Sequence, residues 1–216
     1  WLADLDKYGG QLLCEQKVSF ARELSQLVAR NSAGDIVTWN TVQTVQAGGV
    51  CAEVIAPASL PVNSKLADEI ARTISEQLGV TGVMAVELFE TETGDLLVNE
   101  LAMRPHNSGH FTIEGAITSQ FEQHLRAVLG LPLGDTSMRA KHAVMLNLLG
   151  VDESNNLVEN FEAAMSYGPA LKIHSYQKQP RKGRKMGHIT ALGEDYVQLL
   201  ERCREAAAKL YDSKSA

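Results

Sequence analysis

Hydrophobic and polar positions alternate along most of the chain, and in a few segments the spacing lengthens to that of a helix. Short apolar stretches that alternate with polar residues and end at Gly, Asn, Ser or Asp are typical of β-strands. They predict strands at residues 12–18, 22–29, 36–46, 50–56, 82–89, 96–102, 143–149, 170–176 and 186–191. The sequence therefore predicts many short strands joined by tight turns.

Helical spacing appears in four segments. Leu66, Ile70, Ile74 and Leu78 recur every fourth residue after Asn63-Ser64, a common helix start. The predicted helices cover residues 64–78, 119–129, 157–165 and 194–211, and Leu-Pro-Leu-Gly-Asp-Thr at 131–136 is the candidate linker. The pattern predicts an α+β fold in two parts, residues 1–134 and a smaller domain at 135–216.

Composition narrows the class of protein. With 216 residues and 44% hydrophobic content, the chain can bury a substantial core. A net charge of −6 and a pI of about 5.5 argue against nucleic acid and an anionic membrane as partners. The sequence has no apolar run of membrane-spanning length and no visible signal peptide, and its three cysteines are far apart. We expect a cytoplasmic protein with reduced thiols and no membrane partner.

Residues 98–110 gather polar groups between two apolar stretches. Asn99 and Glu100 lie on a predicted strand, and Glu87 lies on the preceding strand of the same hairpin. Facing strands can present these oxygen atoms to one side, and Mg²⁺ prefers one or two carboxylates together with nucleotide phosphates. The pattern indicates a magnesium–nucleotide site, although two half-exposed acids at a sheet rim would have the same pattern.

Arg104 and the turn Asn107–His110 follow directly. A guanidinium can hold a carboxylate or phosphate through two hydrogen bonds, and the amides of the turn can surround an oxyanion. His106 or His110 could carry a proton, but a histidine beside a turn is more often a hydrogen-bonded structural residue. The residues alone leave both alternatives open.

Two further segments carry possible chemistry. Five cations surround two glycines in residues 178–188, which suits one phosphate monoester or, equally, a solvated hairpin. Glu15–Val18, followed by Glu23, could line an adenine edge and a ribose, but many strand ends have this pattern.

Five motifs then occur in order: EQKVSFARELS at 15–25, QAGGVCAEVIAPA at 46–58, NELAMRPHNSGH at 99–110, TSQFEQH at 118–124 and GRKMGH at 183–188. Together they resemble the 5-(carboxyamino)imidazole ribonucleotide synthases, which are ATP-grasp ligases of purine biosynthesis. The resemblance extends from about residue 12 to the final helix. It implies that residues 1–134 are part of an ATP-grasp lobe.

The resemblance implies a reaction and its ligands. ATP and Mg²⁺ would phosphorylate bicarbonate to carboxyphosphate, which carboxylates 5-aminoimidazole ribonucleotide. The implied cofactor-binding residues are Glu15, Gln16, Lys17, Val18, Glu23, Gln46, Asn99 and Glu100, with Glu87 and Glu100 as metal ligands. The implied substrate-binding residues are Arg104, Asn107, Ser108, Gly109, His110, Lys178, Arg184 and Lys185, with Arg104 and His110 taken as catalytic. The family also suggests a homodimer.

One departure from the family pattern is large. Family members carry an N-terminal domain and a glycine-rich loop over the ATP phosphates, and no such stretch occurs in this sequence. We therefore expect the C-terminal portion of such an enzyme, with negligible turnover by itself. Two alternatives remain at this point: another ATP-grasp ligase, such as a formate-dependent glycinamide ribonucleotide transformylase, and a non-catalytic binding or dimerisation module.

Overall fold

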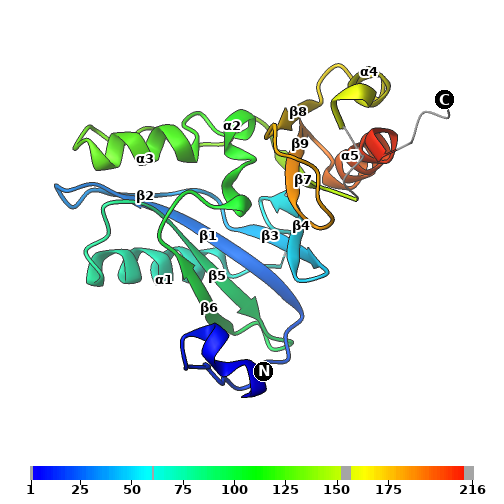
Figure 1. Cartoon of the computed structure of the whole chain (residues 1–216). Helices are drawn as coiled ribbons and strands as arrows, with labels where there is room; N and C mark the ends of the chain where they lie inside the picture. Colours follow the sequence, from blue (N-terminus) through cyan, green and yellow to red (C-terminus); the bar gives the residue numbers. More distant parts are fainter. Residues whose placement is uncertain (1, 60, 152–156, 212–216) are drawn as a thin grey trace.

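A computed structural model of the chain describes residues 2–59, 61–151 and 157–211. In this part of the chain nine strands form one sheet, in the spatial order β6-β5-β1-β3-β4-β7-β9-β8, with β2 paired to β1. Neighbouring strands are antiparallel throughout. Helices α1 and α3 lie on opposite faces of the strands β1 and β5, and α4 and α5 lie near the other end of the sheet (Figure 1). The predicted α+β fold with an antiparallel sheet is confirmed.

The strands are β1 (Arg22–Arg30), β2 (Ile36–Thr38), β3 (Val42–Ala47), β4 (Val50–Ala56), β5 (Gly82–Glu90), β6 (Leu96–Ala102), β7 (His142–Leu149), β8 (Lys172–Ser175) and β9 (Lys185–Gly193). The α-helices are α1 (Ser64–Gln77), α2 (Thr112–Gly115), α3 (Gln120–Val128), α4 (Phe161–Met165) and α5 (Tyr196–Tyr211). Three 3₁₀ segments, η1 (Leu2–Tyr8), η2 (Asn107–Gly109) and η3 (Leu157–Asn160), complete the list. None of the described helices combines the length and apolar character needed to cross a membrane.

Side-chain caps start the two helices that flank the central strands. The Asn63 side chain accepts a hydrogen bond from the Leu66 amide at 3.1 Å, and Ser119 accepts one from the Glu122 amide at 3.2 Å. Such caps satisfy amides that have no partner within the helix. Gly79, at φ +61°, ends α1 in the left-handed conformation that glycine adopts without strain. Both predicted helices are confirmed.

Strand β1 is buried on both faces. Leu24 and Val28 belong to the apolar cluster that contains the α1 residues Ala67 and Ala71, whereas Leu27 belongs to the cluster on the opposite face. Alternation along the strand sends successive side chains to opposite sides. The central strand is therefore held by packing from both layers.

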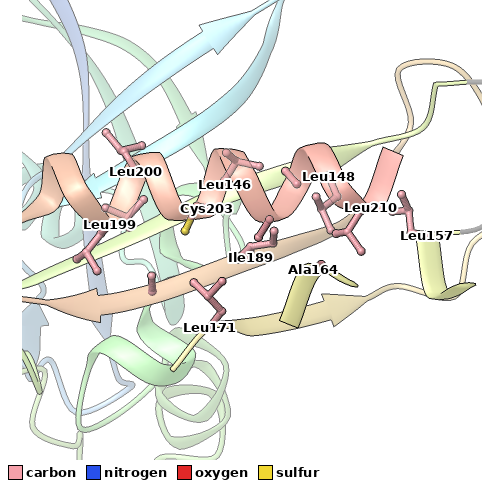
Figure 2. Close-up of a cluster of buried hydrophobic side chains, with 14 of the residues drawn as sticks. Leu146, Leu148, Leu157, Ala164, Leu171, Ile189, Leu199, Leu200, Cys203 and Leu210 are labelled. Atoms are coloured by element: carbon pink, nitrogen blue, oxygen red, sulfur yellow. The ribbon is translucent and has the colours of Figure 1, made fainter. Parts of the chain in front are cut away.

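Helix α5 covers β7 and β9 with an apolar face (Figure 2). Cys203 and Leu210 are fully buried there and belong to the same cluster as Ile189 of β9. On the neighbouring strand β4, the carboxylate of Glu53 accepts two hydrogen bonds from Arg204 of α5, at 2.6 and 2.7 Å. Burial and this ion pair together fix the last helix on the sheet.

The strand predicted at 12–18 is wrong, and the strand predicted at 36–46 is wrong in part. Residues 11–20 form no strand, and Leu13 is 85% exposed: its apolar neighbours are adjacent rather than alternating, and no strand pairs with the segment. The strand predicted at 36–46 is two strands, because the chain leaves the sheet at Trp39. That indole is buried and donates to the Thr118 carbonyl at 3.1 Å.

The sheet is continuous across the predicted linker, since β4 pairs with β7. The two predicted parts therefore share one sheet, and a domain boundary at residue 134 stays a prediction.

Candidate functional site

A cavity of about 450 Å³ lies where β3 ends and β4 begins. It is lined by Glu23, Gln46, Gly49, Val50, Cys51, Glu87, Asn99, Glu100, Arg104, His106 and Lys185. These residues come from strands and loops far apart in the sequence, and ionisable or amide side chains predominate among them. Part of the sequence-predicted site therefore meets in this cavity: Glu23, Gln46, Glu87, Asn99, Glu100, Arg104 and Lys185.

A β-bulge explains how two consecutive residues reach the same cavity. Glu87 of β5 pairs with Glu100 of β6, but the next residue, Leu88, pairs with Val98, so that Asn99 is an additional residue in β6. In a regular strand, Asn99 and Glu100 would point to opposite faces, whereas a bulge re-aims side chains locally. Both residues line the cavity as a result.

Two more bulges border the same cavity. The register of β3 and β4 shifts after Val45, so Gln46 pairs with Cys51. The register of β7 and β9 shifts after Leu148, so Leu149 pairs with Lys185. Gln46, Cys51 and Lys185 all line the cavity. Each of them therefore reaches the cavity from a strand pair whose register is locally irregular.

The acidic groups of the cavity repel one another. Burial and, secondly, the nearby Glu87 carboxylate raise the pKa of Glu23 above its ordinary value, while a hydrogen bond from Gln46 opposes the shift. A cation placed among these carboxylates would relieve the repulsion. Glu87, Glu100 and the Asn99 amide supply the oxygen ligands that Mg²⁺ prefers when phosphate completes its shell, so the residues fit that metal. Among the described residues, no cluster of three or more His, Cys, Asp or Glu has metal-binding geometry by itself.

His106 is fixed between an acid and two serines. Its Nε2 lies 3.1 Å from Glu87 Oε1, and its Nδ1 lies 2.9 Å from Ser108 Oγ, which in turn lies 2.8 Å from Ser25 Oγ. The Ser108 amide also donates to Nδ1, at 3.4 Å, so Nδ1 is the acceptor and Nε2–H donates to Glu87. The arrangement resembles a hydrolase triad, but Ser108 is fully buried and cannot reach a substrate. Its hydroxyl orients His106.

Three amides of the Asn107–His110 turn donate hydrogen bonds locally. The Gly109 amide donates to the His106 carbonyl at 3.0 Å, and the His110 amide donates to the Asn107 carbonyl at 3.2 Å. Together with the Ser108 amide, these donors account for three of the four amides in the turn. Asn107, Ser108 and Gly109 are buried and do not line the cavity. The oxyanion role of the turn therefore stays a prediction, and Arg104 carries the exposed cation.

His110 points into a different environment. Its ring lies 5.1 Å from the His188 ring and 5.7 Å from Phe121, and its Nδ1 lies 3.0 Å from Gln120 Nε2. Burial, followed by the positive charges that His106, Lys185, His174 and Lys178 can carry, lowers the pKa of His110 to about 4. His110 does not line the cavity, whereas His106 does.

The sequence left open whether His106 or His110 carries a proton and the resemblance favoured His110, whereas the cavity favours His106. Pro105 favours an extended backbone before it, and His106 itself is extended at φ −121° and ψ 158°. In an extended segment, residues two apart share a side, so the spacing of Arg104 and His106 was the available signal.

Of the basic loop, Lys185 alone is brought to the cavity among the three predicted phosphate ligands. Lys178 stands 5.0 Å from the centre of the Tyr176 ring, and Arg184 donates to the Gln179 carbonyl at 3.2 Å. Glu15–Val18 lie in the irregular segment before β1 and also do not line the cavity.

A larger cavity, of about 820 Å³, lies at the opposite ends of β3 and β4. It is lined by residues such as Trp39, Pro57 and Tyr196 and shares none of the predicted site residues. Size alone would select it, but the smaller cavity holds the acids, the cations and His106. We therefore take the smaller cavity as the candidate site.

Comparison with known families finds two matching domains in the chain. The ATP-grasp domain matches residues 2–121, more than half of the chain, and the phosphoribosylaminoimidazole carboxylase C-terminal domain matches residues 143–202. The N5-carboxyaminoimidazole ribonucleotide synthase of Mycobacterium tuberculosis strain H37Rv is 51% identical over 203 residues, which are 92% of this chain and 47% of the relative. The synthase of Corynebacterium ammoniagenes is 48% identical over 95% of this chain and 52% of the relative.

Solved structures give the same result. The N5-carboxyaminoimidazole ribonucleotide synthetase of Thermotoga maritima matches with a TM-score of 0.79 at 41% identity, over 90% of this chain and 53% of its own. The Aspergillus clavatus N5-carboxyaminoimidazole synthase, in complex with ADP and 5-aminoimidazole ribonucleotide, matches with a TM-score of 0.80 at 33% identity, over 91% and 53%. The chain spans about half the length of the relatives it matches. It therefore belongs to the ATP-grasp family, and the relatives to which it is similar are N5-carboxyaminoimidazole ribonucleotide synthases.

Proposed function

We propose that this chain forms part of a ligase that carboxylates 5-aminoimidazole ribonucleotide with bicarbonate and MgATP. ATP transfers its γ-phosphoryl group to bicarbonate, giving ADP and carboxyphosphate. Carboxyphosphate then delivers its carbon as CO₂ to the amine and releases phosphate. The products are the N5-carboxylated ribonucleotide, ADP and phosphate, as the names of the relatives suggest.

The acidic side of the cavity is proposed to bind the nucleotide. Glu87 and Glu100 would hold Mg²⁺ beside the phosphates with Asn99 close by, and Glu23 with Gln46 would face the nucleotide. When bound, the metal supplies positive charge against the phosphate oxygens. Glu15–Val18 remain proposed adenine contacts.

The basic side is proposed to bind the other substrates. Arg104 presents an exposed guanidinium suited to bicarbonate, and Lys185 extends positive charge toward the ribonucleotide phosphate, with Lys178 and Arg184 on the adjoining loop. His106, held by Glu87 and Ser108, replaces His110 as the proposed proton-handling group, because it lines the cavity.

A single observation carries the proposal: acids, an amide, Arg104, His106 and Lys185 converge on one cavity in a chain of this family. The rival transformylase and the non-catalytic module have no specific observation in their favour. A homodimer and a cytoplasmic location stay predictions.

Calorimetry tests the proposal on the 216-residue chain. MgADP and 5-aminoimidazole ribonucleotide should each bind, and Glu87→Gln should weaken MgADP binding by about tenfold, as expected for removing one charged metal ligand. Glu76→Gln, at an exposed position of α1, is the matched control and should bind as the unchanged chain does. Equal affinities in all three proteins would favour a module without this site.

A further inference from the structure

A glutamine fourteen residues away clamps the backbone of His106. Gln120, the first residue of α3, is fully buried. Its Oε1 accepts a hydrogen bond from the His106 amide at 2.8 Å, and its Nε2 donates to the His106 carbonyl at 2.7 Å. The side-chain amide therefore pairs with the His106 backbone as a neighbouring strand would.

The second Nε2 hydrogen of Gln120 is also used, by His110 Nδ1 at 3.0 Å. One acceptor bond and two donor bonds thus satisfy a group that has no access to water. The backbone N–H of Gln120 donates to Thr112 Oγ1 at 2.9 Å. The Thr112 hydroxyl in turn donates to the Gly109 carbonyl at 2.6 Å. A Cβ on Gly109 would overlap the Gln120 side chain. The contact therefore needs glycine at that place in the turn.

We propose that Gln120 is a positioning residue of the candidate site, which holds the Arg104–His106 segment against the cavity through the His106 backbone. It touches neither substrate nor metal. The segment has no regular secondary structure of its own, so its hydrogen bonds to Gln120 replace a strand partner. The inference rests on the proposed function, because it concerns the same site.

The chain offers a matched control on the same helix. Gln123 is also fully buried, and it makes the same kind of clamp: Nε2 donates to the Gly134 carbonyl and Oε1 accepts from the Gly134 amide, each at 2.8 Å. Gly134 lies in the segment before β7, and neither it nor Gln123 lines the cavity. Replacing either glutamine with methionine removes a buried clamp of equal geometry, but only Gln120 is joined to His106.

The first experiment uses the complete encoded protein, with any sequence that adjoins residues 1–216 in its reading frame, and follows phosphate release. Gln120→Met should lower kcat by about tenfold or more, with the KM for ATP changed by less than about threefold. Gln120→Glu keeps the acceptor oxygen but sets a second acceptor against the His106 carbonyl, so it should lower kcat as well. Gln123→Met should leave both constants within about twofold. Equal losses in the two methionine variants would overturn the inference, since the effect would then be one of stability.

The second experiment uses hydrogen exchange on the 216-residue chain and does not depend on turnover. Gln120→Met should speed exchange of the His106 amide by at least about tenfold, and Gln123→Met should do the same for the Gly134 amide instead. Unchanged exchange at His106 would overturn the inference. If the unsubstituted complete protein releases no phosphate, the proposed function fails, and selective exchange at His106 still decides whether Gln120 holds the segment.

Discussion

His106 and His110 lie four residues apart and face different surroundings. His106 lines the candidate cavity and donates to Glu87, whereas His110 packs among Phe121, Gln120 and His188. Only the first can meet a ligand in the cavity. The second accepts a hydrogen bond from Gln120 at Nδ1, so a neutral His110 carries its proton on Nε2.

Substitution of these two histidines should separate their roles. In the complete encoded protein, His106→Gln should lower kcat/KM for the ribonucleotide by about tenfold to a hundredfold, as expected for a charge-assisted hydrogen bond in a site. His110→Gln should have the smaller effect, because His110 does not line the cavity. Phosphate release at varied ribonucleotide concentration measures both. A larger loss in His110→Gln would restore His110 as the proton-handling group.

The buried His110 and His188 should also stay neutral at pH values at which an exposed histidine is protonated. Burial, followed by the positive charges of neighbours, lowers the pKa of His110 to about 4 and that of His188 to about 3. The groups that contribute are His106, His174, Lys178 and Lys185 around His110, and His174 and His110 around His188. Tyr176 lies against His188, with its hydroxyl 2.8 Å from Nδ1.

The sign of the stability effect follows from these shifts. Unfolded histidine has a pKa of about 6.5, so below that pH the unfolded chain binds protons that the folded chain excludes. Each of the two histidines should therefore destabilise the fold by about 1.4 kcal/mol per pH unit as the pH falls from about 6.5 to about 4. Imidazole NMR signals of both residues should not move between pH 8 and 5. A titration midpoint near 6.5 for either would contradict the prediction.

Among the elements, helix α5 depends on packing in the way its sequence pattern predicts. Its sheet-facing residues are buried in one cluster (Figure 2), and its opposite face is exposed, as at Val197. Helix propensity alone supplies little stability in water, so burial of the apolar face must supply most of it.

Leu210→Ala should therefore lower the free energy of unfolding by about 2–5 kcal/mol, since the side chain is fully buried and leaves a cavity. Val197→Ala, on the exposed side of the same helix, should change it by less than about 0.5 kcal/mol. Urea denaturation of the two variants gives both values. Similar losses would mean that the helix is held by something other than this face.

Much of the element pattern could be predicted from the sequence, because alternation and helical spacing report burial directly. The helices α1 and α3 begin where Asn63 and Ser119 can cap them, and β5 follows its buried apolar residues. The bulge at Asn99 could not be predicted. Register depends on pairing with β5, and a pattern of single residues contains no information on which residue is left unpaired.

The candidate site could also be predicted from the sequence only in part. Glu87, Glu100 and Arg104 carry chemistry that their residue types disclose, and they do meet in the cavity. The residue type of Gln120 does not indicate a role in the site, because a glutamine at a helix start is ordinarily exposed. Its importance arises from a contact between segments fourteen residues apart, and that contact exists only after folding.

At the scale of the whole molecule, one continuous sheet joins the part matched by the ATP-grasp domain to the part matched by the carboxylase C-terminal domain. The β4–β7 pair forms the junction, and Arg204 of α5 reinforces it by reaching Glu53 of β4. The cavity lies on this junction, since Lys185 comes from the second part and the acids come from the first. The two parts therefore act as one support for the site.

In the proposed function the acids of that site would hold a metal on one side of the phosphates, but phosphoryl transfer also needs positive charge and amide donors around the transferred group. The 216-residue sequence contains no glycine-rich loop of the kind that supplies them. By itself the chain should release phosphate at least about 100-fold more slowly than a full-length relative, such as the Corynebacterium ammoniagenes synthase, under the same ATP, bicarbonate and ribonucleotide concentrations. Glu87→Gln in the chain should then change its background rate little, because chemistry is not limited by the metal site. A substrate-dependent rate close to that of the relative would show that Arg104, Lys185 and their neighbours suffice to stabilise the transferred phosphoryl group.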